Sequence, residues 1–157
     1  MTFNDLITQF TDEQQLTLLS DWKWLVGDDK LPILLTATGN AILQSTVDGT
    51  VHELDTAEGW IRPLCSSVEE LQSRLNSEDF VREHFHQARV SELLNAGVAR
   101  ETGEVFSHKT PLPLGGADEL DNIEATDLEV HFSVSGQIFE QVSALPNGTK
   151  IAGVHTR

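Results

Sequence analysis

The sequence predicts an α+β fold, in which an antiparallel β-meander has N-terminal and middle helices packed against it. The turns of the meander are predicted by Gly39-Asn40 and Asp48-Gly49, because these residues tolerate the positive φ of two-residue hairpin turns. The segments between the turns are rich in Ile, Leu, Val and Thr, which strands favour. Nearly continuous apolar runs at 31–35 and 41–43 predict strands covered on both faces, so we expect helices to pack across the sheet.

Four strands are expected in order along the chain. The third turn is predicted at Ala57-Glu58-Gly59, and the fourth strand at Trp60–Cys65. The four expected segments are 31–38, 41–47, 50–55 and 60–65.

Two capping boxes predict N-terminal helices, one formed by Thr2 with Asp5 and one by Thr11 with Gln14. Trp22 and Trp24 are interpreted as core residues that pack this region on the sheet, because aromatic side chains bury large areas. The apolar residues at helical spacing are Phe3, Leu6, Ile7 and Phe10, followed by Leu16, Leu19 and Trp22.

Two middle helices are predicted by their N-caps. Ser67 and Glu70 have the spacing of a capping box, and the helix that they start is expected to end near Asn76. Ser77 is expected to cap a second helix that reaches about Asn95, with Gly97 as its stop.

The C-terminal third is expected to begin with a short strand within 98–106 and a stiff turn at 111–116. Alternation of Val130, Phe132 and Val134 predicts another strand, and apolar residues at helical spacing predict a last helix from about Ser135. Pro146-Asn147-Gly148 is expected to end that helix, with Ile151, Ala152 and Val154 as a possible edge strand.

Length and composition indicate one domain over residues 1–157. The lone cysteine, Cys65, excludes an internal disulfide framework and fits a reducing compartment. The N-terminus lacks the charged and apolar regions of a signal peptide, and no window approaches the roughly 20 apolar residues of a membrane span. We therefore expect a cytoplasmic protein without a membrane partner.

The charge is strongly acidic: 25 Asp and Glu residues against 10 Lys and Arg residues give a net charge of −15. Such a surface repels nucleic acid and attracts a basic protein. The leading candidates for contact with that partner lie in the acidic segment 117–129, although a solvated loop is the alternative. These candidates are Asp118, Glu119, Asp121, Glu124, Asp127 and Glu129.

No catalytic or metal site is predicted, and no cofactor is expected. The six histidines include His84 and His86, whose spacing of two points them to different sides of a helix. Cys65 ends an apolar strand, where a free cysteine is commonly buried. The paired Gly115-Gly116 lacks the basic residue and loop-to-helix spacing of a phosphate loop.

Several short motifs resemble a bacterial family long catalogued as a domain of unknown function. It is now associated with the C-terminal domain of immunity proteins against a type VI secretion DNase effector. The resemblance covers about residues 22–151, after a short helical segment at 1–21, and the family often has Asp where this chain has Asn40. The motifs are Thr38–Ala41, Asp48-Gly49, Leu54–Gly59, Pro111–Gly116, Leu120–Glu124, Asp127–Phe132, Gly136–Ile138 and Leu145–Thr149.

The resemblance implies a cytoplasmic α+β protein, without catalytic residues, that binds and neutralises a toxin. With the acidic charge, the hypothesis is a non-enzymatic immunity-type protein that occludes a basic, nuclease-like effector. Two alternatives remain open: a small metal-dependent hydrolase, and a housekeeping binding module with a small-molecule pocket near Gly115-Gly116.

Overall fold

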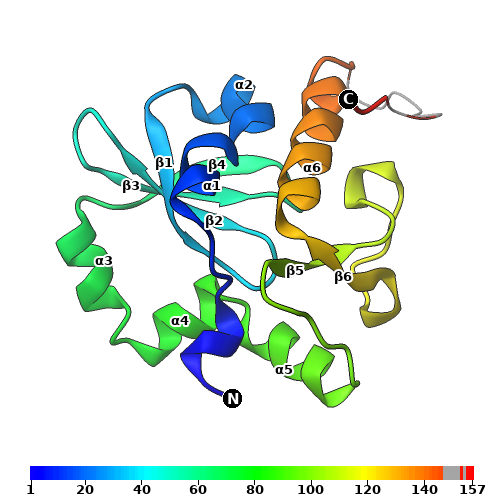
Figure 1. The fold of residues 1–157 in the computed structure, drawn as a ribbon, viewed down its shortest axis with the longest axis horizontal. Helices are drawn as coiled ribbons and strands as arrows, with labels where there is room; N and C mark the ends of the chain where they lie inside the picture. Colours follow the sequence, from blue (N-terminus) through cyan, green and yellow to red (C-terminus); the bar gives the residue numbers. More distant parts are fainter. Residues whose placement is uncertain (147–152, 154) are drawn as a thin grey trace.

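A computed structural model describes residues 1–146, 153 and 155–157. Its main sheet is the predicted antiparallel meander, with the strand order β1-β2-β3-β4 (Figure 1). Leu43 lies opposite His52, and the register between β2 and β3 is continuous. Leu54 lies opposite Ile61, but the pairing of β3 with β4 shifts by one residue between Val51 and His52. The strands are β1 (Lys30–Leu35), β2 (Ala41–Ser45), β3 (Val51–Asp55) and β4 (Trp60–Cys65).

Two clusters of buried side chains cover opposite faces of this sheet, as the continuous apolar runs predict. Adjacent residues of β2 divide between them, because Ile42 joins one cluster and Leu43 joins the other. Phe80 and Phe85 contribute to the first cluster. Trp22 is fully buried in the second, which confirms its predicted core role.

The N-terminal segment is less helical than predicted. Both capping boxes are present, but the first starts only the 3-10 helix η1 (Phe3–Leu6). The second starts α1 (Asp12–Thr17), which is followed by η2 (Ser20–Trp22) and α2 (Lys23–Val26).

Leu16, Leu19 and Trp22 are expected to share one buried helix face, and this expectation is wrong for Leu16. Leu16 is 69% exposed, whereas Leu18 is buried with Leu19 and Trp22. The chain leaves α-helical geometry after Thr17, so the spacing of a continuous helix no longer decides which side chain faces the core.

Ile7, which is also expected on a helix, instead forms an antiparallel bridge with Thr36. Arg100 fixes this extended segment, because its guanidinium donates to the carbonyl oxygens of Asp5 (3.2 Å) and Ile7 (2.7 Å). The N-terminal segment is thereby tied to a residue almost a hundred positions later in the chain.

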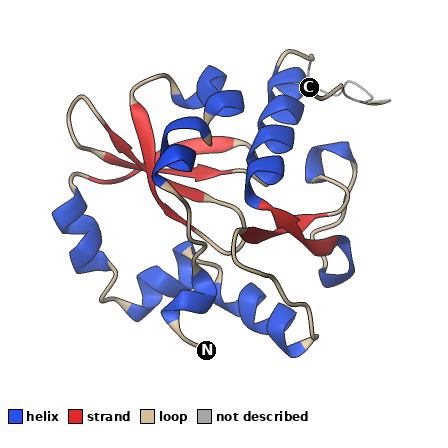
Figure 2. Cartoon of the chain, in the orientation of Figure 1, coloured by secondary structure: helices blue, strands red, loops and turns tan. Residues whose placement is uncertain are grey.

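The middle helices lie along one side of the sheet (Figures 1 and 2). They are α3 (Val68–Arg74), α4 (Glu78–His84) and α5 (Gln87–Asn95). Ser67 and Ser77 cap α3 and α4 as predicted, but the Glu70 carboxylate accepts from Ser66 rather than completing a box with Ser67. The single helix expected from Ser77 to Asn95 is broken between α4 and α5.

The last part of the chain departs most from prediction. A second antiparallel pair, β5 (Glu104–His108) with β6 (Ile123–Asp127), leads directly into α6 (Leu128–Ser143). The strand predicted at 130–134 is wrong, and the helix starts before Ser135, because the Asp127 side chain caps it by accepting from Val130 N. The buried face of α6 has helical spacing: Leu128, His131, Phe132, Gly136, Gln137 and Ile138.

Helix α6 packs very closely against both the sheet and η2. A Cβ on Gly39 would lie 2.3 Å from the His131 ring, and one on Gly59 would lie 2.4 Å from the Phe139 ring. A Cβ on Gly136 would lie 2.5 Å from the carbonyl oxygen of Asp21. Two turns at the same end of the meander therefore need glycine for this approach as well as for their positive φ.

Three expectations lie beyond these observations. Residues Asn147 and Gly148 of the helix stop, and the edge strand at Ile151, Ala152 and Val154, fall outside the described residues. That residues 1–157 form one domain stays a prediction. Among the described residues, no helix has the length and apolar content that a membrane span needs.

Candidate functional site

The acidic segment 117–129 forms η4 (Leu120–Asn122), β6 and the first turn of α6. All of its predicted contact residues are exposed, but they have different surroundings. The six are Asp118, Glu119, Asp121, Glu124, Asp127 and Glu129.

Asp118 is bound within the protein. Its Oδ1 atom accepts from His108 Nε2 at 2.9 Å and from Arg89 Nη1 at 3.1 Å, which joins the loop to β5 and α5. The hydrogen bond from His108 and the charge of Arg89 hold the pKa of the Asp118 carboxyl below its usual value. This carboxylate therefore fixes the loop that carries the other acidic residues.

Glu119, Asp121 and Glu124 form the unpaired part of the segment. Within the described part of the chain, their carboxylates make no hydrogen bond or ion pair. Asn122 braces the loop that precedes β6. Its Nδ2 donates to the carbonyl oxygens of Thr110 (2.9 Å) and Ala117 (2.8 Å). These three carboxylates, which we call the acidic edge, are thus displayed from a fixed backbone.

The paired glycines serve the same loop. Gly115 has a φ of +94°, and a Cβ on Gly116 would lie 1.8 Å from the carbonyl oxygen of Thr110. Only a glycine fits at residue 116 without moving the backbone. Neither glycine lines a cavity described below, but Pro111, Leu112 and Leu114, which precede them, line the second of those cavities.

The remaining two predicted contacts have structural partners. Asp127 caps α6 through a 3.0 Å hydrogen bond from Val130 N. Glu129 accepts from Gln14 Nε2 at 3.1 Å, which connects α6 to α1. The structure therefore does not gather all six carboxylates into one cluster.

A buried histidine, His131, joins α6 to the turns of the sheet. Its Nε2 lies 3.0 Å from the Gly39 carbonyl oxygen and 2.9 Å from Thr56 Oγ1, while its Nδ1 lies 2.8 Å from Ser107 Oγ. A carbonyl can only accept, so Nε2 carries the proton and Nδ1 accepts from Ser107. Burial lowers the pKa of His131 to about 4, which keeps the ring neutral.

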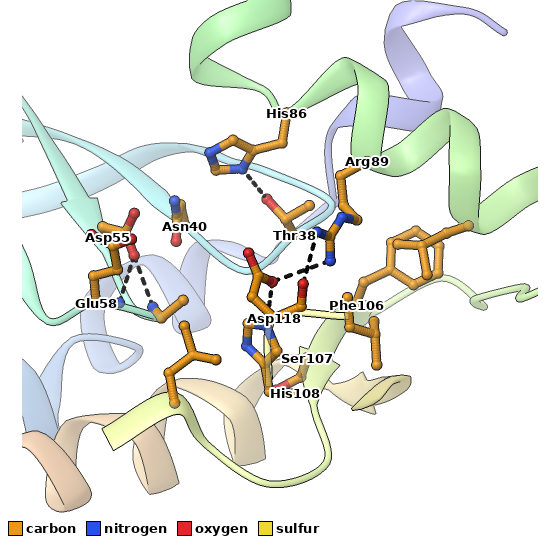
Figure 3. Close-up of a pocket in the computed structure, with 14 residues that line it drawn as sticks. Thr38, Asn40, Asp55, Glu58, His86, Arg89, Phe106, Ser107, His108 and Asp118 are labelled. Carbon is orange, nitrogen blue, oxygen red and sulfur yellow. Dashed lines mark hydrogen bonds and ion pairs between the residues drawn. The ribbon is translucent and has the colours of Figure 1, made fainter. Parts of the chain in front are cut away.

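A cleft of about 250 Å³ lies between the end of the main sheet, α5 and β5 (Figure 3), and its wall includes Ser107, the partner of His131. It continues into a second cavity of about 390 Å³, because Thr38, Ala57, Ser107, His108 and Leu112 line both. Burial raises the pKa of Asp55 in its wall, although backbone N–H groups and His86 oppose that rise. The polar side chains in the wall of the cleft are Thr38, Asn40, Asp55, Glu58, His86, Arg89, Ser107, His108 and Asp118.

His86 has the only positive φ of a non-glycine residue in the described chain, with φ +51° and ψ +47°. This left-handed conformation breaks the helix that the sequence predicts over 77–95. It turns the imidazole toward the sheet, where Nδ1 lies 2.8 Å from Thr38 Oγ1. A strained residue that lines a cleft indicates a functional site.

Little in the sequence predicts the residues of the cleft. Asn40 lies in a predicted turn and Asp55 precedes one, but nothing in the sequence distinguishes them from ordinary turn residues. Arg89 gives no signal of its own. His84 and His86 do point apart, since His84 Nδ1 instead lies 3.0 Å from Glu53 Oε2.

Within the described residues, no group of three or more His, Cys, Asp or Glu residues is placed to hold a metal ion. Cys65 is buried and free, and burial raises the pKa of its thiol above the usual value. A raised pKa disfavours the thiolate that a nucleophile requires.

Comparison with protein families matches residues 65–139 to the family described as T6SS immunity protein Tdi1, C-terminal. The resemblance inferred from the sequence motifs is therefore confirmed. The matched range includes the acidic segment, α5, β5 and most of α6. The motifs at 38–59 and 145–149 lie outside it. No curated protein matches the chain.

We predict that His131 makes folding stability depend on pH. Its pKa is lower in the folded protein than the usual 6.5, so protons bind the unfolded state preferentially between about pH 6.5 and pH 4. Stability should fall by roughly 3 kcal/mol as the pH decreases through that range. Urea unfolding at a series of pH values measures this loss.

The matched comparison is His131→Gln, which should be less stable at pH 7 but should lack this share of the pH dependence. Asp55, whose pKa is raised, contributes with the opposite sign in both proteins, so the informative quantity is the difference between the two curves. Parallel curves for the wild type and His131→Gln would contradict the assignment.

Proposed function

We propose that this chain is a non-enzymatic immunity-type protein that binds and neutralises a basic, nuclease-like effector. The observation that carries the proposal is the match of residues 65–139 to the C-terminal region of a type VI secretion immunity protein. The protein that gives the family its description is an immunity protein, and such a protein acts by binding an effector. A cytoplasmic location, where an intracellular nuclease would act, belongs to the same proposal.

The charge of the chain supports a basic partner. A net charge of −15 creates a field that accelerates association with a cationic protein. The same field opposes direct binding of nucleic acid. Inhibition would therefore arise by covering the cationic surface with which a nuclease holds its substrate.

The proposed contact surface is the acidic segment, with the acidic edge at its centre. Glu119, Asp121 and Glu124 have no internal partner among the described residues. Glu119 and Asp121 project from the loop that Asn122 and Asp118 brace, and Glu124 projects from the adjoining strand β6. A braced loop loses little conformational freedom on binding, which favours affinity. Asp127 and Glu129 extend the same acidic segment toward α6, while their structural bonds limit how far they can move.

Capture of the partner tests the function. The purified chain, immobilised and exposed at low salt to lysate of the source cells, should retain a basic protein that a salt gradient releases, since salt screens charge-steered contacts. That protein, produced in a bacterial host, should degrade DNA and stop growth, and co-production of this chain should restore growth. A retained protein that is harmless to the host, or toxicity that this chain leaves unchanged, would contradict the proposal.

Charge reversal tests the contact surface. Glu119→Lys combined with Asp121→Lys should slow association with the captured partner by about tenfold at low salt and flatten its salt dependence, because both charges steer the encounter. Surface plasmon resonance at several salt concentrations measures the association rate.

The matched control is Glu69→Lys combined with Glu83→Lys, which changes the net charge equally on α3 and α4. Both substituted residues are exposed. If the control slows association as much as the first pair, long-range charge rather than the acidic edge determines binding. Unchanged kinetics in the first pair would exclude the proposed surface.

A further inference from the structure

Two deeply buried polar side chains in the cleft have an atom without a partner among the described residues. Asn40 is 3% exposed, and its Oδ1 accepts from Thr56 N at 3.0 Å, but its Nδ2 makes no hydrogen bond to any residue that the structure describes. Asp55 is 8% exposed, and its Oδ1 accepts from the backbone N–H groups of Ala57 and Glu58 at 2.9 and 2.8 Å. Its second carboxylate oxygen has no partner in the described chain.

The orientation of the Asn40 amide follows from its neighbours. A backbone N–H can only donate, so the atom that faces Thr56 N must be the oxygen, which leaves the amide nitrogen as a donor. Ala41 pairs with Leu54 in the sheet, so Asn40 and Asp55, the next residues outward, lie side by side. Figure 3 shows both at the wall of the cleft, near His86.

The hydrogen bonds of two threonine hydroxyl groups indicate which ring nitrogen of His86 carries the proton. Thr36 Oγ1 accepts from Asn40 N at 3.0 Å and lies 3.1 Å from Thr38 Oγ1, its remaining partner. With every group satisfied, Thr36 donates to Thr38, and Thr38 donates to His86 Nδ1. His86 Nε2 then carries the proton and presents a second donor.

We propose that this cleft binds a small, neutral, planar molecule whose edge carries adjacent hydrogen-bond donor and acceptor groups, as in a nucleobase or an aromatic carboxamide. Its acceptor would receive the N–H groups of Asn40 and His86, and its donor would bind the free oxygen of Asp55. A guanidinium has donors only and leaves Asn40 and His86 unmatched. A carboxylate has acceptors only and meets the acidic groups of Asp55, Glu58 and Asp118.

The adjoining cavity fits the rest of such a molecule. Its walls include Leu112, Leu114, Val134, Ile138 and Phe139, so it offers an apolar surface to a ring or its substituent. A nucleic acid polymer is disfavoured by the charge of −15, which leaves a free base, nucleoside or carboxamide. This inference does not rest on the proposed function, because no effector is needed for it.

The experiment uses the full chain labelled with ¹⁵N and four probes: cytidine, uridine, adenosine and nicotinamide. The side-chain amide signal of Asn40 is identified by its loss in Asn40→Asp, which keeps the acceptor for Thr56 but removes the donor. At least one probe should shift that signal saturably, with a Kd below about 1 mM by calorimetry. The probe that binds distinguishes a nucleoside from a carboxamide source.

Asp55→Asn keeps an oxygen for the backbone N–H groups of Ala57 and Glu58 but converts the free acceptor into a donor. It should weaken binding of the active probe by about tenfold or more, whereas Glu140→Gln, an equal charge change on the exposed side of α6, should not. The proposal is overturned if no probe moves the Asn40 signal, or if Asp55→Asn folds and binds as the wild type does.

Discussion

The arrangement of the candidate surfaces depends on the neutral ring of His131. This one side chain, on α6, contacts the turn before β2, the turn after β3 and the strand β5. Gly39 has to be a glycine because the ring occupies the space of its side chain. Because the His131 side chain is buried, both of its nitrogen atoms need partners, and the three segments supply them in this relative position.

The cleft and the acidic edge both follow from that junction. Asn40 and Asp55 flank the residues that bind His131, so the wall of the cleft is fixed by the same contacts. On the other side, β5 and β6 are held against α6, and the loop between them is closed by Asp118, Arg89 and His108. The acidic edge is consequently rigid at its base, although its carboxylates face solvent.

The meander could be predicted because its turns and strands are each determined by residues that are close together in the sequence. Each turn carries a glycine at the required position, and each strand is a short run with several residues that strands favour, although β1 and β4 each also contain a proline. The start of α6 could not be predicted in the same way, because the alternation of Val130, Phe132 and Val134 imitates a strand. Asp127 decides the outcome as an N-cap, and its role depends on where β6 ends.

The cleft could not be predicted because it depends on contacts between distant residues. His86 leaves the helical conformation to meet Thr38, which is 48 positions away in the sequence, and a pattern read along one helix cannot reveal this. The acidic segment was found from composition alone, yet composition could not separate the braced Asp118 and the capping Asp127 from the unpaired residues between them. The class of partner, an effector, is inferred from the family resemblance, because the shape of the site does not indicate it.

We propose that the acidic edge is the surface that contacts a basic effector. Hydrogen–deuterium exchange of this chain, alone and bound to its captured partner, tests it most directly. We expect reduced exchange in the backbone of residues 117–124, and unchanged exchange in α3 and α4. Reduced exchange in α3 and α4, with no change at residues 117–124, would contradict it.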